Sequence, residues 1–109
     1  MPWVMKQIIE KMSFNPYPGT LNILLIDQDI AKYVEFINKA KGVIIEPLDS
    51  SFFQGKCIKT MIEKTVEGAV VIPLMPGYPE NKVEIIAPVY LRKYLHLSDG
   101  DLVSIYFSQ

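Results

Sequence analysis

After Gly42 the sequence breaks into short apolar runs, separated every few residues by turn-forming residues, and this pattern most constrains the fold. The runs, each as long as a typical strand, cover residues 43–45, 57–62, 66–72, 83–87 and 102–107. There is no regular alternation of strands and helices, which disfavours a doubly wound parallel sheet. The pattern predicts a mainly β (α+β) fold, a small barrel of short strands with a few short helices.

The helical patterns are few and lie mostly near the N-terminus. Apolar residues recur at helical spacing over residues 4–12, and this helix is expected to end before Asn15-Pro16. A second helix is expected from Asp27 to Gly42, after a short strand over residues 22–26. A third, shorter helix is expected from 88 to 95.

Glycine and proline predict breaks within the β region. Gln54-Gly55-Lys56 is expected to form a turn, and residues 76–79 a loop. Gly68 interrupts an apolar run and is expected to mark a β-bulge. Residues 1–109 are expected to form a single domain, because a chain of this length fits one hydrophobic core.

Charge and cysteine content limit the classes of function. The 11 basic and 12 acidic residues give a net charge of −1 and are interspersed, which argues against nucleic-acid binding or membrane-surface binding. The single cysteine, Cys57, cannot form a disulfide within the chain, so a reducing cytoplasm is the expected location. No apolar run approaches the roughly 20 residues that a membrane-spanning helix needs.

Thr20 and Asn22 are candidate metal ligands. They lie two residues apart at the entrance of an expected strand, so their side chains point to the same side of an extended chain. A hydroxyl and an amide carbonyl are hard oxygen ligands, which Mg²⁺ accepts alongside phosphate oxygens. The alternative is that both are ordinary turn residues that cap backbone groups.

Glu84 and Arg92 are candidate ligand-binding residues. Glu84 interrupts an apolar strand; facing inward it would need a partner or a ligand hydroxyl, whereas facing outward it would simply be solvated. Arg92 lies at the start of an expected helix, where free N–H groups can receive a phosphate. The alternative for Arg92 is a surface salt bridge.

These segments together resemble the archaeal CTP-dependent riboflavin kinase family. Residues 14–22, FNPYPGTLN, are similar to the family pattern F-x-P-Y-x-G-T-L-N, and residues 68–73 are similar to the strand that follows it. Residues 84–88, Leu91-Arg92 and residues 97–101 resemble the C-terminal signature. The order and the intervals agree, so the resemblance covers nearly the whole chain.

The resemblance implies a six-stranded cradle-loop barrel and an enzyme that transfers a phosphoryl group from CTP to the 5′-hydroxyl of riboflavin, giving FMN and CDP. By position, Thr20 and Asn22 match the family's Mg²⁺ ligands, and Glu84 matches a flavin-contacting residue that could also accept the hydroxyl proton. The residues that match the nucleotide-contacting stretch are Val89, Tyr90, Leu91 and Arg92.

Two departures from the family pattern bear on activity. Family members carry a first strand and a glycine-rich, nucleotide-cradling loop before the first helix, and this chain is expected to lack both. We therefore expect impaired activity and an unpaired barrel edge that favours a homodimer. Pro76 stands where the family has a flavin-binding threonine, so a hydroxyl is missing there.

Two alternative functions follow from the same residues. Residues 88–103 also resemble the swapped-hairpin DNA-binding regulators of the AbrB type, although those lack the segment at residues 16–22 and are basic on one face. The third hypothesis is a non-catalytic relative that binds flavin or nucleotide without turnover.

Overall fold

The computed structural model describes residues 2–47 and 53–107. They form one antiparallel sheet of six strands with three short helices, which confirms the expected mainly β fold. In chain order the elements are α1 (Pro2–Met12), β1 (Leu21–Leu24), α2 (Asp27–Lys39), β2 (Val43–Ile45), β3 (Gly55–Ile62), β4 (Val66–Pro73), β5 (Lys82–Ile86), α3 (Leu91–Tyr94) and β6 (Ile105–Tyr106).

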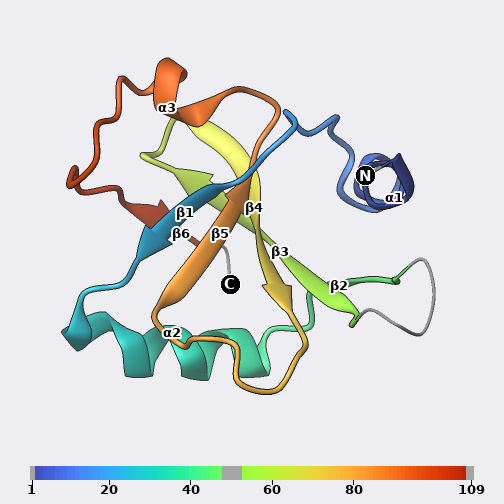
Figure 1. The fold of residues 1–109 in the computed structure, drawn as a ribbon, viewed down its shortest axis with the longest axis horizontal. Coiled ribbons are helices and arrows are strands. Elements are labelled where there is room, and N and C mark those ends of the chain that lie inside the picture. The colour runs from blue at the N-terminus through green and yellow to red at the C-terminus, as the bar shows by residue number, and fades with distance from the viewer. Residues whose placement is uncertain (1, 48–52, 108–109) are drawn as a thin grey trace.

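The six-stranded sheet curls into a half-barrel, which is consistent with the barrel that the riboflavin kinase resemblance implied (Figure 1). Its strand order is β1-β5-β4-β3-β2, and β6 also pairs with β3. β2 pairs with the first half of β3, through Ile44 opposite Lys56, while β6 pairs with its end, through Ile105 opposite Ile62. β2 and β6 therefore share one edge of the sheet, and β1 forms the other.

Apolar residues cover both faces of the sheet. On one face the buried cluster consists of Leu21, Tyr33, Ile62, Val66, Val70, Val83, Ile85, Ala87 and Leu91. On the other face α1 contributes Ile8 and Met12, which pack with Cys57 and Ala69 of the sheet. Gln7 fixes α1 to the end of β2, because its side-chain amide donates to the Glu46 carbonyl and accepts from the Glu46 N–H, both at 2.8 Å.

α2 and α3 are shorter than the sequence patterns predicted, whereas α1 ends at Met12 as expected. α2 ends at Lys39 instead of at Gly42, and the Lys56 ammonium donates to the carbonyls of Ile37 and Ala40 at this end. α3 is a single turn that begins three residues after Pro88, because the backbone is still extended at Tyr90. No helix in the described ranges is long and apolar enough to cross a membrane.

The outer strands are also shorter than expected, with β1 ending at Leu24 and β6 covering only two residues. The expected turn at residues 54–56 is wrong, because Gly55 and Lys56 already belong to β3 and pair with both β2 and β4. These cross-strand hydrogen bonds on two sides hold the backbone extended, which the local sequence does not reveal.

Gly68 marks a close backbone approach instead of the expected bulge. The register between β3 and β4 is uninterrupted, with Thr60 opposite Gly68 and Lys59 opposite Ala69. A Cβ atom on Gly68 would lie 2.3 Å from the Ile86 carbonyl oxygen and 3.0 Å from Cδ1 of Ile62. Glycine is therefore required where β4 passes closest to the end of β5.

We expect Gly68→Ala to lower the free energy of unfolding by about 1–3 kcal/mol, because the new methyl group meets a backbone oxygen that cannot move independently. Urea denaturation followed by circular dichroism measures the change. Gly55→Ala is the matched control, since its Cβ would find its nearest atom at 3.7 Å and should cost less than about 1 kcal/mol. Equal stabilities for the two variants would contradict the steric explanation.

Candidate active site

The pairing of β1 with β5 brings three of the predicted site residues together. Asn22 lies directly opposite Glu84 in the antiparallel register, so the two side chains project from the same face of the sheet. The Thr20 hydroxyl donates to Oδ1 of Asn22 across 3.4 Å. A hydroxyl, an amide oxygen and a carboxylate thus converge at the exposed edge of the sheet, although Thr20 and Glu84 are 64 residues apart in the sequence.

The two neutral oxygens fit a magnesium ion that is bound jointly with a phosphate. Neighbouring ligands of an octahedral Mg²⁺, each 2.0–2.1 Å from the ion, lie about 3 Å apart, and the Thr20 and Asn22 oxygens are 3.4 Å apart. Among the described residues no three His, Cys, Asp or Glu side chains gather into a metal site. Two oxygens alone would leave most of the coordination to water and phosphate, as is usual for Mg²⁺.

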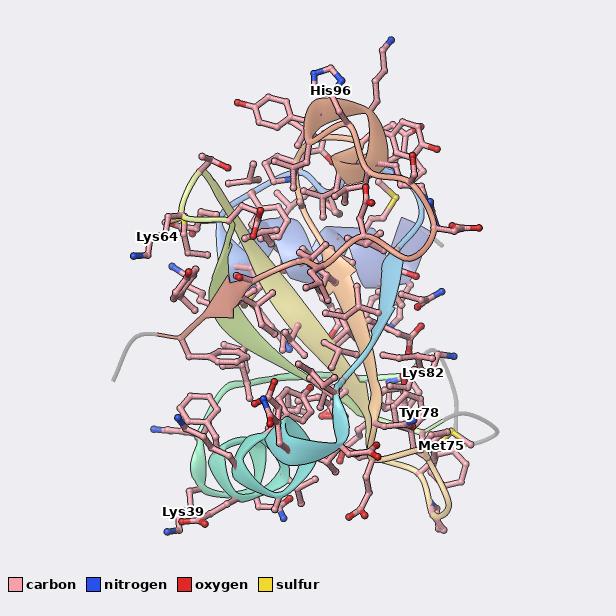
Figure 2. The ribbon with its side chains drawn as sticks, turned by 90° about the vertical axis from the view of Figure 1, so that its left-hand side faces the viewer. Lys39, Lys64, Met75, Tyr78, Lys82 and His96 are labelled. Carbon is pink, nitrogen blue, oxygen red and sulfur yellow. The ribbon has the colours of Figure 1, made fainter. Side chains whose placement is uncertain are left out.

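Glu84 is half-buried and has a protein partner, as the inward-facing alternative required. The Tyr78 hydroxyl donates to its Oε2 atom across 2.5 Å. The pKa of Tyr78 is raised above its usual value, first by burial and then by the hydrogen bond to Glu84. Tyr78 comes from the loop between β4 and β5, and Lys82, the first residue of β5, lies close to its ring (Figure 2).

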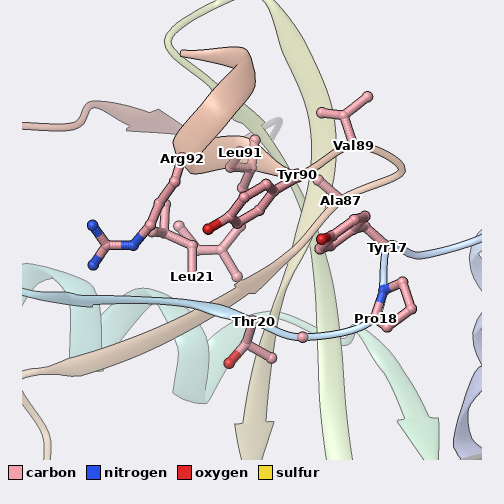
Figure 3. A pocket seen from close by; sticks show the side chains of 11 residues that line it. Tyr17, Pro18, Thr20, Leu21, Ala87, Val89, Tyr90, Leu91 and Arg92 are labelled. Carbon is pink, nitrogen blue, oxygen red and sulfur yellow. The ribbon is translucent and has the colours of Figure 1, made fainter. Parts of the chain in front are cut away.

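A cavity of about 180 Å³ opens next to Thr20. Tyr17 and Tyr90 form one wall, their rings stacked with centroids 4.9 Å apart and planes inclined by 13° (Figure 3). Thr20 lines the cavity and hydrogen-bonds to Asn22, whereas Asn22 and Glu84 themselves lie outside its lining. Both tyrosines remain more than two-fifths exposed, which leaves aromatic surface for a planar ligand.

The stretch from Val89 to Arg92 lines the same cavity, but its members differ in what they can offer. Leu91 is buried in the core and forms part of the wall. The Arg92 guanidinium pairs with the carboxylate of Asp99 at 2.9 Å, which is the salt bridge left open by the sequence. Asp99 is almost fully exposed, so this pair contributes little to stability and Arg92 can exchange to an anionic ligand.

Sequence reasoning gave no role to Tyr17 or Tyr78, which the structure brings to the site. Tyr17 follows Pro16 in a rigid turn, and its N–H donates to the Ala87 carbonyl at 2.7 Å, next to the candidate nucleotide stretch. Tyr78 sits within a Pro-Gly-Tyr-Pro loop. An aromatic residue held between prolines in a loop was the available signal for both.

Comparison with known proteins identifies the family. A family model that carries the name CTP-dependent riboflavin kinase and the description "Domain of unknown function DUF120" matches residues 1–107. Riboflavin kinase of Methanothermobacter thermautotrophicus is 36% identical over 99 residues, 91% of this chain and 77% of the relative. Riboflavin kinase of Methanobrevibacter smithii is 42% identical over 97 residues, 86% of this chain and 74% of the relative.

Other relatives are longer than this chain. Riboflavin kinase of Archaeoglobus fulgidus is 41% identical over 103 residues, which is 92% of this chain but 43% of the relative. The chain thus spans about half the length of the first curated relatives that it matches. The comparisons give no support to the alternative of an AbrB-like regulator, and the chain belongs to the CTP-dependent riboflavin kinase domain family.

Proposed function

We propose that this chain is a CTP-dependent riboflavin kinase. The 5′-hydroxyl oxygen of riboflavin forms a bond to the γ-phosphorus of CTP while the bond from that phosphorus to the bridging oxygen breaks, giving FMN and CDP. Reactions of this kind depend mainly on positioning and on neutralising phosphate charge. The observation that carries the proposal is the pairing of Asn22 with Glu84 next to Thr20, which hydrogen-bonds to Asn22 and lines the cavity.

Each predicted residue has a role in this proposal. Thr20 and Asn22 hold Mg²⁺, which supplies positive charge to the transferring phosphate. Glu84 binds the flavin and is the candidate acceptor for the proton of the 5′-hydroxyl, since its carboxylate lies on the same face as Asn22. The residues proposed to contact the cytidine nucleotide are Val89, Tyr90, Leu91 and Arg92.

The nucleotide donor tests the proposal most directly. We expect the chain to form FMN from riboflavin and CTP with a kcat/KM at least about tenfold above that with ATP, since a difference of one or two hydrogen bonds to the base is worth this much. Separation of FMN from riboflavin by chromatography measures turnover with each donor. Equal or faster turnover with ATP would contradict the proposed donor.

The same experiment distinguishes the non-catalytic alternative. Pro76 is exposed and offers no hydroxyl at the position of the family threonine, so the contact that this threonine would make to the flavin is missing. Binding of riboflavin, measured by quenching of flavin fluorescence, without FMN formation under any donor would support this second function.

The remaining expectations concern partners and location. We propose that the reaction takes place in the cytoplasm and involves neither nucleic acid nor a membrane. We also propose a homodimer through the free edge of β1, where Leu24 and Ile26 are more than half exposed. Sedimentation velocity tests the dimer, and a monomer at all concentrations would contradict it.

A further inference from the structure

We propose that Tyr78 is a positioning residue for the reaction, holding the Glu84 carboxylate in the orientation that meets the flavin. This inference rests on the proposed function. The Tyr78 hydroxyl donates to Oε2 of Glu84 across 2.5 Å, and it leaves the other carboxylate oxygen, Oε1, for a ligand. A short hydrogen bond to a charged acceptor is among the stronger ones that a protein makes.

The loop that carries Tyr78 is built to fix it in place. The Tyr78 N–H donates to the Met75 carbonyl at 3.4 Å, and Gly77 has a φ of +80°. These are the features of a type II turn, in which proline is favoured at the second position and glycine at the third. Pro76 occupies that second position, so it presets the turn that delivers Tyr78.

The turn gives Pro76 a structural purpose. Where the family resemblance expects a threonine hydroxyl, this chain has a proline and, two residues later, a tyrosine whose hydroxyl reaches the flavin-matching carboxylate. Lys82 adds a cation 5.7 Å from the centroid of the Tyr78 ring. Met75, Tyr78 and Lys82 lie close together at one end of the sheet (Figure 2).

Glu84 needs such a support because its strand alone does not fix its side chain. The backbone of Glu84 is held on both sides, opposite Asn22 on β1 and opposite Val71 on β4. Of these two neighbours, Val71 has no polar side-chain atom, and Asn22 is a proposed metal ligand. Without Tyr78 the Glu84 side chain would populate several rotamers. With Tyr78 it is already ordered, so riboflavin binding loses less free energy to ordering this side chain.

The test is a double-mutant cycle on riboflavin kinase activity. We expect Tyr78→Phe to lower kcat/KM for riboflavin about tenfold, with the KM for CTP unchanged, since one hydrogen bond to a charged group is lost. In a Glu84→Ala background the same substitution should have no further effect, because Tyr78 acts through the carboxylate. Riboflavin affinity from fluorescence quenching provides a readout that does not need turnover.

The control is Tyr106→Phe, which removes a hydroxyl from a half-exposed tyrosine on β6 whose ring lies beside Lys64. It should match the wild-type protein in every assay. Thermal unfolding of each variant identifies any loss of folding. If Tyr78→Phe is unstable, Lys82→Met provides a second probe, since Lys82 is the first residue of β5 and lies beside the Tyr78 ring. Lys82→Met should then weaken riboflavin binding without changing the KM for CTP.

The outcomes separate this inference from the proposed function. An active wild-type protein with Tyr78→Phe equal to it, or additive effects of Tyr78→Phe and Glu84→Ala, overturns the positioning role alone. If Tyr78→Phe raises the KM for CTP as much as it lowers kcat/KM for riboflavin, the positioning role is also overturned, since that result indicates a general structural effect. A wild-type protein that neither binds riboflavin nor forms FMN overturns the proposed function, and this inference with it.

Discussion

Asn22→Ala is expected to lose about 100-fold of Mg²⁺-dependent FMN formation while keeping the fold. The Asn22 amide oxygen lies beside the Thr20 hydroxyl and opposite Glu84, so its removal takes away one of two proposed protein ligands at the point where the phosphate charge must be neutralised. Asn22 is exposed at the edge of the sheet, so truncation leaves no buried cavity and should cost little stability.

The measurement is the rate of FMN formation across a Mg²⁺ titration. Thr20→Ala should show a similar loss, and Thr20→Ser should restore most of the activity because it keeps the hydroxyl. Asn38→Ala, an exposed asparagine on α2, is the matched control and should behave like the wild-type protein. Wild-type rates for Asn22→Ala and Thr20→Ala at every Mg²⁺ concentration would show that these residues are not metal ligands.

The relation of Thr20 to Asn22 was available from the sequence, whereas their relation to Glu84 was not. Successive side chains of an extended chain point to opposite sides, which is a local property. Two side chains that are two residues apart therefore lie on the same side. The position of Glu84 depends on the register between β1 and β5, which joins segments about 60 residues apart. Only the family resemblance linked these residues before the structure was known.

The incorrect predictions of local structure have a common cause. Gly55 and Gly68 were interpreted as turn and bulge signals, yet both lie within paired strands. At Gly68 the reason for glycine is the nearby Ile86 carbonyl, which belongs to another strand. Pro88 was expected to open a helix, but the chain remains extended until Tyr90, whose ring stacks on that of Tyr17. Tertiary contacts decided each of these conformations.

The roles of the tyrosines show the same limit for the site. Composition and spacing do not distinguish an aromatic residue in the core from one at a cavity, and Tyr33 and Tyr90 look alike in the sequence. In the structure burial raises the pKa of Tyr33 to about 12, as expected for a core residue, whereas Tyr90 is nearly half exposed beside the candidate nucleotide stretch. Burial therefore assigns the first to the fold and the second to the candidate site.

Arg92→Met is the second prediction with a large expected effect. The Arg92 side chain lines the cavity with Thr20 and Tyr90, and its present partner is a single exposed carboxylate, that of Asp99. A phosphate carries more charge than this carboxylate and accepts two parallel hydrogen bonds from a guanidinium. We expect the substitution to lower kcat/KM for CTP about 100-fold, because these bonds strengthen as charge develops on the transferring group.

Steady-state kinetics with CTP and riboflavin varied separately measure this effect. Lys93→Met is the matched control, since Lys93 is the adjacent exposed cation on α3 and does not line the cavity. Asp99→Asn removes the competing carboxylate and should lower the KM for CTP slightly, because Arg92 is then free for the phosphate. If Arg92→Met and Lys93→Met weakened CTP use equally, the loss would reflect net charge alone, and the stretch from Val89 to Arg92 would need another role.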